Sequence, residues 1–173
     1  MFASKTMKVA AKELIQFFGS PIGYLFLLAF LGFTLFVFFW GEAFFARNIL
    51  DVRPMFEWMP VLLIFLSSAL TMRMWSEERR SGTQEFLLTL PATTSELVVG
   101  KFLACWTLLG IALLLTLPLP LTLANVDSSV MGLDWGPILA GYVAAILLGA
   151  SYIAVGLFVS AGSDNQIVAL ILA

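Results

Sequence analysis

Long runs of apolar residues, separated by short polar stretches, dominate the pattern along the chain. A helix needs about 20 predominantly apolar residues to cross the hydrocarbon core of a bilayer. The uncharged runs reach that length or come close to it. The pattern therefore predicts an all-α, polytopic bundle of transmembrane helices. The four expected spans are residues 22–40, 59–74, 101–124 and 136–160.

A fifth apolar segment, residues 166–173, follows Asp164 and Asn165. Its eight residues would make about 12 Å of helix, which is too short to cross a bilayer. We therefore expect four full spans and the start of a fifth, in a sequence that looks truncated after the fourth span.

The N-terminal segment, residues 2–19, mixes apolar side chains with three lysines and Glu13. The apolar positions fall roughly on one helical face, which is typical of a basic amphipathic helix in the cytoplasmic headgroup layer. A frayed basic tail is the alternative. Pro21 is expected to end this helix, because its ring disfavours helical geometry in the residue before it.

Charged and proline residues near the ends of the expected spans suggest where each helix stops. Lys101 opens the third span and is interpreted as a headgroup anchor, and Arg73 is expected to snorkel from the last turn of the second span. Pro118 and Pro120 fall about 26 Å beyond Lys101, near the far interface, where a broken helix costs little.

The composition agrees with a membrane protein: 61% of the residues are hydrophobic, 12% are charged and the mean hydropathy is +1.00. A soluble domain carries about twice that charged fraction. The single cysteine, Cys105, excludes an internal disulfide, and the absence of histidine leaves metal sites poorly supplied with ligands.

The expected spans carry no ionisable group at mid-membrane depth, where catalysis would need one. Ser67, Ser68 and Ser151 have no histidine or mid-membrane lysine to activate them and are interpreted as packing hydroxyls. The chain is therefore not expected to be an enzyme. No catalytic, cofactor-binding or metal-ligating residue is assigned, and no nucleic-acid partner is expected.

Lysine and arginine are distributed unevenly between the two sides of the expected bundle. With the N-terminus inside, seven of the nine lie on the cytoplasmic side: Lys5, Lys8, Lys12, Arg73, Arg79, Arg80 and Lys101. The outside holds Arg47 and Arg53. This positive-inside bias predicts a cytoplasmic N-terminus and a cytoplasmic loop at residues 75–96.

Small residues in the fourth span recur at a spacing of four, at Gly141, Ala145 and Gly149. Small side chains on one face let helix backbones approach closely. We expect these residues to form a helix-packing seam, either within the protein or between two copies.

The loop of residues 75–96 combines a charged cluster with two helix-start signals. Ser81 with Gln84, and Thr93 with Glu96, have the spacing of capping boxes. Between them, residues 84–90 are expected to form about two helical turns before Pro91. A solvated loop that only fixes topology would need the arginines alone. The pattern therefore favours a docking element for a cytoplasmic partner.

At this loop the chain resembles the permease subunits of type-2 ABC transporters, in their gliding-motility-like branch. The matching residues are Met72-Arg73, Glu77-Glu78, Ser81-Gly82-Thr83, Glu85, Leu87-Leu88-Thr89 and Pro91, then Gly100-Lys101-Phe102. The resemblance extends to "SPIGY" at 20–24, "DVRPMFEWMP" at 51–60, "LDWGPILAGY" at 133–142, "GLFVS" at 156–160 and "NQIVA" at 165–169.

The resemblance implies a half-transporter with six spans, an amphipathic helix at the inner surface and a coupling helix between spans two and three. It implies that this coupling helix docks on a separate cytoplasmic ABC ATPase, which would bind the ATP and magnesium. The residues expected to contact that ATPase are Glu77, Glu78, Arg79, Arg80, Gly82, Thr83, Glu85, Phe86 and Leu87.

The expected function is thus that of a permease subunit in an exporter-like, ATP-driven transporter of the bacterial inner membrane. A second permease half, identical or different, would complete the pore. The alternative is a non-transporting membrane anchor or scaffold for an ATPase-driven envelope assembly.

Overall fold

The structure, a computed structural model, describes residues 2–41, 52–80, 82, 93–126, 134–163 and 165–173. Throughout this part of the chain the regular structure is helical, without a strand. Among the described residues, four helices are long and apolar enough to cross a membrane: Gly23–Gly41, Arg53–Thr71, Thr94–Ala124 and Trp135–Gly162. The expected all-α bundle of membrane-capable helices is confirmed.

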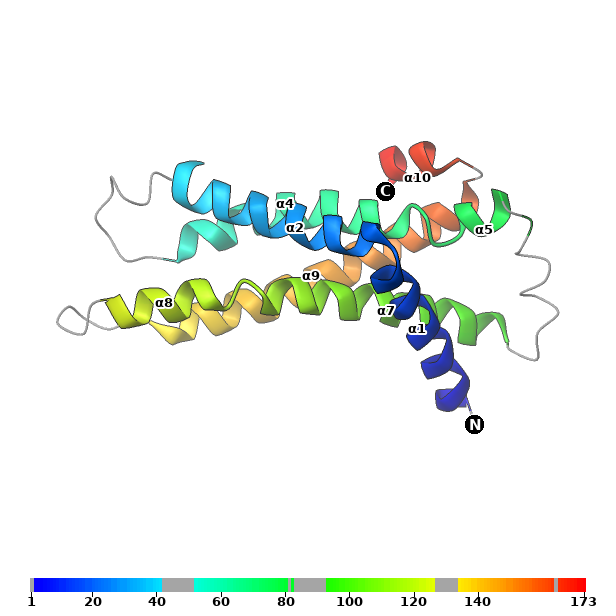
Figure 1. Cartoon of the computed structure of the whole chain (residues 1–173), viewed down its shortest axis with the longest axis horizontal. Coiled ribbons are helices and arrows are strands. Elements are labelled where there is room, and N and C mark those ends of the chain that lie inside the picture. Colours follow the sequence, from blue (N-terminus) through cyan, green and yellow to red (C-terminus); the bar gives the residue numbers. More distant parts are fainter. Residues whose placement is uncertain (1, 42–51, 81, 83–92, 127–133, 164) are drawn as a thin grey trace.

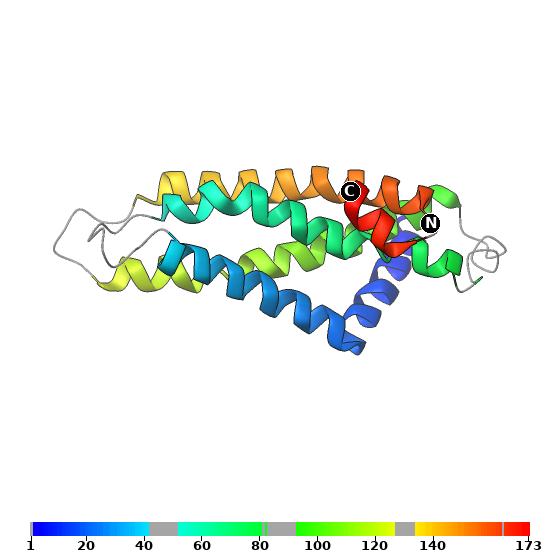
Figure 2. The same cartoon turned by 90° about the horizontal axis from the view of Figure 1, so that it is seen from above.

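The helices follow one another in an up-and-down order (Figure 1). In chain order they are α1 (Phe2–Gly19), α2 (Pro21–Phe36) with the π-helical continuation η1 (Val37–Gly41), α4 (Arg53–Thr71), α5 (Ser76–Arg80), α7 (Thr94–Leu114), α8 (Pro118–Val126), α9 (Trp135–Gly162) and α10 (Gln166–Leu172). Figure 2 shows α4 beside α9 along their length, while α1 and α5 lie at the same end of the bundle.

Prolines explain several of the helix ends. Pro21 is the first residue of α2, where its missing N–H costs nothing. Pro54 occupies the first turn of α4 in the same way, so this helix begins at Arg53, before the expected start of the span at residue 59. The expected break near Pro118 is present, because α7 ends at Leu114 and α8 begins at Pro118.

The contact between α4 and α9 depends on glycines in α9. A Cβ built on Gly141 would lie 2.7 Å from Cδ1 of Phe56 in α4. A Cβ on Gly156 would overlap the hydroxyl of Thr71, the last residue of α4, and would lie 3.0 Å from its Cβ. The two helices therefore approach closely at both places.

The contact between α7 and α9 adds a further glycine and a hydrogen bond. A Cβ on Gly149 would lie 2.7 Å from a methyl group of Leu109. The hydroxyls of Thr116 and Tyr142 are 2.8 Å apart and both residues are buried. Ala145, between the two glycines of the expected seam, is also buried. In this chain the seam residues thus lie against neighbouring helices of the same molecule.

The helix α1 has one face buried against the bundle and one face exposed. Thr6, Ala10 and Glu13 are buried on the face toward α7, where a Cβ on Gly100 would lie 2.6 Å from a methyl group of Val9. Met7 and Ile15 are 63% and 72% exposed. Lys8 and Lys12 are exposed too, with Lys8 on the same side as Ile15. Val9, Leu14, Phe17 and Phe18 also pack, partly buried, against the apolar core, so Met7 and Ile15 are the large apolar residues of α1 that stay well exposed among the described side chains.

Candidate functional site

The polar loop expected from the sequence leaves and re-enters the bundle at one end. The helix α4 ends at Thr71, residues 72–75 form a turn, and α5 covers Ser76–Arg80. Gly82 has a φ of 70°, in the left-handed region, and its N–H donates to the carbonyl of Arg79 at 3.1 Å. A glycine is favoured at this position because a side chain in that conformation is strained.

The expected ATPase-contact residues fall partly within the described chain. Glu77, Glu78, Arg79 and Arg80 belong to α5, and Gly82 follows it. Thr83, Glu85, Phe86 and Leu87, together with the expected helix at residues 84–90, lie outside the described residues.

The loop ends on a complete capping box at the start of α7. The backbone N–H of Glu96 donates to the hydroxyl of Thr93 at 3.4 Å, and the N–H of Thr93 donates to a carboxylate oxygen of Glu96 at 2.8 Å. The expected box at these residues is confirmed. It satisfies two backbone donors that a helix start otherwise leaves open.

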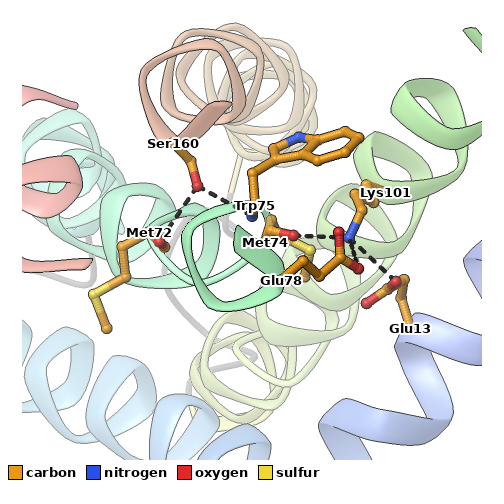
Figure 3. Close-up of polar contacts among 7 residues, drawn as sticks. All are labelled: Glu13, Met72, Met74, Trp75, Glu78, Lys101 and Ser160. Carbon is orange, nitrogen blue, oxygen red and sulfur yellow. Dashed lines mark hydrogen bonds and ion pairs between the residues drawn. The ribbon is translucent and has the colours of Figure 1, made fainter. Parts of the chain in front are cut away.

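A buried lysine connects three elements at this end of the bundle (Figure 3). Lys101 of α7 is only 2% exposed. Its Nζ donates to Oε1 of Glu78 in α5 and to the carbonyl of Met74 in the turn, each at 2.7 Å. It also donates to Oε1 of Glu13 in α1, at 3.4 Å. We call Lys101, Glu13, Glu78 and Met74 the Lys101 cluster.

This burial corrects the expectation that Lys101 anchors at the headgroups. Two carboxylates and a carbonyl replace the water that the ammonium would otherwise keep, and Nζ lies over the ring of Trp75, 4.8 Å from its centroid. Each charge at this site depends on the others, because removing one partner leaves a charge buried without its counter-charge, which is strongly destabilising.

The turn between α4 and α5 is held by a second buried side chain, Ser160 of α9. Its hydroxyl donates to the carbonyl of Met72 at 3.3 Å and accepts from the backbone N–H of Trp75 at 3.3 Å (Figure 3). Ser76 donates its own hydroxyl to the same Met72 carbonyl. Side chains thus satisfy backbone groups that the end of α4 leaves without helical partners.

Reasoning from the sequence missed most of this arrangement. It interpreted Lys101 as an anchor, placed Glu13 among the polar residues of α1 and included Ser160 only within the matching stretch at 156–160. Lys101 is 88 positions from Glu13 and 23 from Glu78, so no local spacing connects them. One usable signal was the stripe of Thr6, Ala10 and Glu13 along a single face of α1.

The polar side chains at this end of the bundle connect helices to one another. In the described part of the chain, no group of three or more histidine, cysteine, aspartate or glutamate side chains could hold a metal ion. The polar groups instead pair with one another, across α1, α5, α7 and α9.

One comparison with known proteins identifies a family. A family model described as "ABC-2 family transporter protein" matches residues 3–173, which is nearly the whole chain. Neither the curated proteins nor the solved structures contain a match. The family match agrees with the four membrane-capable helices. The chain is therefore a multi-pass membrane protein that belongs to the ABC-2 transporter family.

Proposed function

We propose that the chain is the permease subunit of an exporter-like ABC transporter, driven by ATP that a separate subunit hydrolyses. The observation that carries this proposal, beside the family, is the attachment of α5. This helix begins the polar segment between α4 and α7, and the buried Lys101 cluster joins it to α1 and α7.

Such an attachment is what an ATP-driven permease requires. A partner that pushes on a loop moves the spans only if the loop is fixed to them by contacts with a defined geometry. Here α5 is held by the ion pair of Glu78 with Lys101, whose charged atoms are 2.7 Å apart. The side chain of Lys101 is only 2% exposed. The other end of the loop leads directly into α7, whose first turn is closed by the local Thr93–Glu96 box.

The proposed contact surface for the ATPase is the loop itself. The charged residues of α5, together with Gly82, Thr83, Glu85, Phe86 and Leu87, would dock on the ATPase and orient the loop there. Charged hydrogen bonds are worth about 1.5–3 kcal/mol each where water is excluded, and much less where they stay exposed.

The proposed assembly contains two permease halves and two ATPases in the bacterial inner membrane, with the N-terminus of the permease in the cytoplasm. The exposed lysines of α1, Lys8 and Lys12, would then face the anionic headgroups of the inner leaflet. Met7 and Ile15 would lie toward the acyl chains.

The orientation can be tested with single cysteines at positions 83 and 128. The seven-to-two distribution of lysine and arginine predicts that a cysteine at 83 reacts only from the cytoplasm and one at 128 only from outside. Membrane-impermeant maleimide, added to intact cells or to inverted vesicles, distinguishes the two sides. Labelling of both positions from one side would exclude the four-span arrangement. The native Cys105 gives no background because it is buried.

Docking of the loop can be tested with Gly82→Val and Glu85→Lys. Valine at a φ of 70° is strained by about 1–3 kcal/mol, and the lysine reverses a charge at the proposed contact. We expect both variants to insert normally, because neither residue lies in a span. Association with the ATPase should weaken by about 10- to 150-fold for a desolvated charged contact, as measured by co-purification over a salt series.

The matched controls are charge reversals at Arg47 and Arg53, on the opposite side of the proposed membrane. They should leave association with the ATPase unchanged. If the loop variants bind the ATPase and support ATP turnover as the wild type does, the loop is a topology signal and the docking proposal fails.

A further inference from the structure

We infer that residues 72–75, the turn between α4 and α5, form the joint through which movement of the loop reaches the spans. Ser160 and Lys101 are positioning residues of this joint, the first toward α9 and the second toward α7 and α1. The inference rests on the proposed function, because it needs an ATPase that moves α5.

The main chain of the turn is held by other helices, which distinguishes it from an ordinary helix end. The Met72 carbonyl accepts from Ser160 of α9, and the Met74 carbonyl accepts from Lys101 of α7. The Trp75 N–H donates to Ser160 as well. Hydrogen bonds have narrow ranges of distance and angle, so a displacement of the turn must either break these bonds or move the neighbouring helices with it.

The route toward α9 is reinforced by close packing one turn away from Ser160. Gly156 leaves no room for a Cβ against Thr71, the residue just before the turn. Thr71 and Ser160 are both fully buried. The helix α9 has 28 residues and is about 42 Å long, and Trp135, at its opposite end, lies about 38 Å from Ser160. A shift at Ser160 therefore reaches the far end through a continuous helix.

The route toward α7 and α1 passes through the ammonium of Lys101. It is bonded to Glu78 of α5 at 2.7 Å and to Glu13 of α1 at 3.4 Å. The contact of Gly100 with Val9 keeps α1 against α7 beside this ion pair. Movement of α5 thus acts on both helices through one buried charge, whose separation from its partners is costly.

The polar character of the joint favours this role over simple packing. Met74 and Trp75 of the turn also pack in the apolar core, but apolar contacts are non-directional. Directional bonds instead specify one position of the turn relative to each helix. A displacement of the turn is therefore passed on to α9 and α7 rather than absorbed by a change of register.

The test uses Ser160→Ala and Glu13→Gln, which are both close in size to the native residue. Ser160→Ala removes the hydroxyl that binds the turn, and its matched control is Ser151→Ala, an exposed serine of the same helix that bonds only within α9. Glu13→Gln removes one ion pair while Glu78 still neutralises Lys101, and its control is Glu57→Gln, an exposed glutamate of α4.

The readout is the labelling rate of Trp135→Cys, an exposed position at the far end of α9, in the complex with the co-purified ATPase. Rates are measured without nucleotide and with a non-hydrolysable ATP analogue. We expect Ser160→Ala and Glu13→Gln to retain the ATPase and the nucleotide-free rate. The nucleotide-dependent ratio of rates should fall by about 2- to 30-fold. Both control variants should keep the wild-type ratio.

Equal nucleotide-dependent ratios in Ser160→Ala, Glu13→Gln and their controls, within a complex that forms, would overturn this inference and leave the proposed function intact. A wild-type chain that binds no ATPase would overturn the proposed function, and this inference with it. The first result is read from labelling and the second from co-purification, so the two failures are distinguishable.

Discussion

Replacing Lys101 by methionine is expected to lower the free energy of unfolding by about 3–5 kcal/mol, because it leaves buried carboxylates without their cation. Glu13 is 6% exposed, and the Glu78 carboxylate lies 2.7 Å from the ammonium that is lost. The change also removes a donor from the Met74 carbonyl. The effect is measured by the denaturant or thermal midpoint of the protein purified in a mild detergent.

The control is Lys12→Met on α1, where the native lysine is exposed. Surface substitutions of this kind change stability by about 0.5 kcal/mol or less. A triple variant, Lys101→Met with Glu13→Gln and Glu78→Gln, removes all three charges and should recover part of the lost stability. If Lys101→Met is as stable as Lys12→Met, the buried ion pairs described at this end of the bundle are wrong.

Replacing Gly156 by alanine is expected to destabilise the protein by about 1–3 kcal/mol, as overpacking of a close contact does. The new Cβ would overlap the Thr71 hydroxyl and lie 3.0 Å from its Cβ and 3.2 Å from its Cγ2. Thr71 cannot move aside easily, because its χ1 is restricted and its hydroxyl donates to the Ser67 carbonyl at 2.8 Å. The helices α4 and α9 must therefore separate.

Gly110→Ala in α7 provides a control with the opposite sign. A Cβ at Gly110 meets nothing within 4 Å, so the substitution should gain up to about 1 kcal/mol from the higher helix propensity of alanine. Adding Thr71→Ala to Gly156→Ala should recover part of the loss. A gain in stability for Gly156→Ala alone would contradict the close contact of α4 with α9.

The parts of the fold that depend on local sequence could be predicted. The apolar runs give the four membrane-capable helices, because hydropathy and length decide which segments can cross a bilayer. Pro21 and Pro118 start helices because a proline has a fixed φ and no N–H, which suits the first turn of a helix. This effect is local to the proline and its neighbours. The Thr93–Glu96 box depends on a spacing of three.

The Lys101 cluster could not be predicted from spacing. A lysine near the end of a span is satisfied equally by headgroups, by water or by buried carboxylates, and hydropathy does not distinguish these environments. Its partners lie in α1 and α5, and they meet only after the bundle has formed. The bonds from Ser160 to Met72 and Trp75 were hidden for the same reason.

The packing of α1 was only partly predictable from its amphipathic pattern. Its mixture of lysines and apolar residues correctly suggested a helix, but an amphipathic pattern separates residues into only two classes. The structure adds a third class, the small and polar residues Thr6, Ala10 and Glu13, which are buried against α7. The close approach of α1 to α7 needs a glycine opposite Val9 and the Thr6 carbonyl, and Gly100 provides it.

The measurement that tests the central proposal most directly is the ATP turnover of the complex isolated with the wild-type chain from bacterial membranes in a mild detergent. The proposed function predicts that an ABC ATPase co-purifies with the chain, and that turnover responds to the chain's incorporation in lipid. It also predicts that Gly82→Val, measured beside the Arg53 charge reversal, loses the ATPase or this response. Isolation of the intact, folded chain without any ATPase, and with no ATP turnover above that of an unrelated membrane protein, would contradict it.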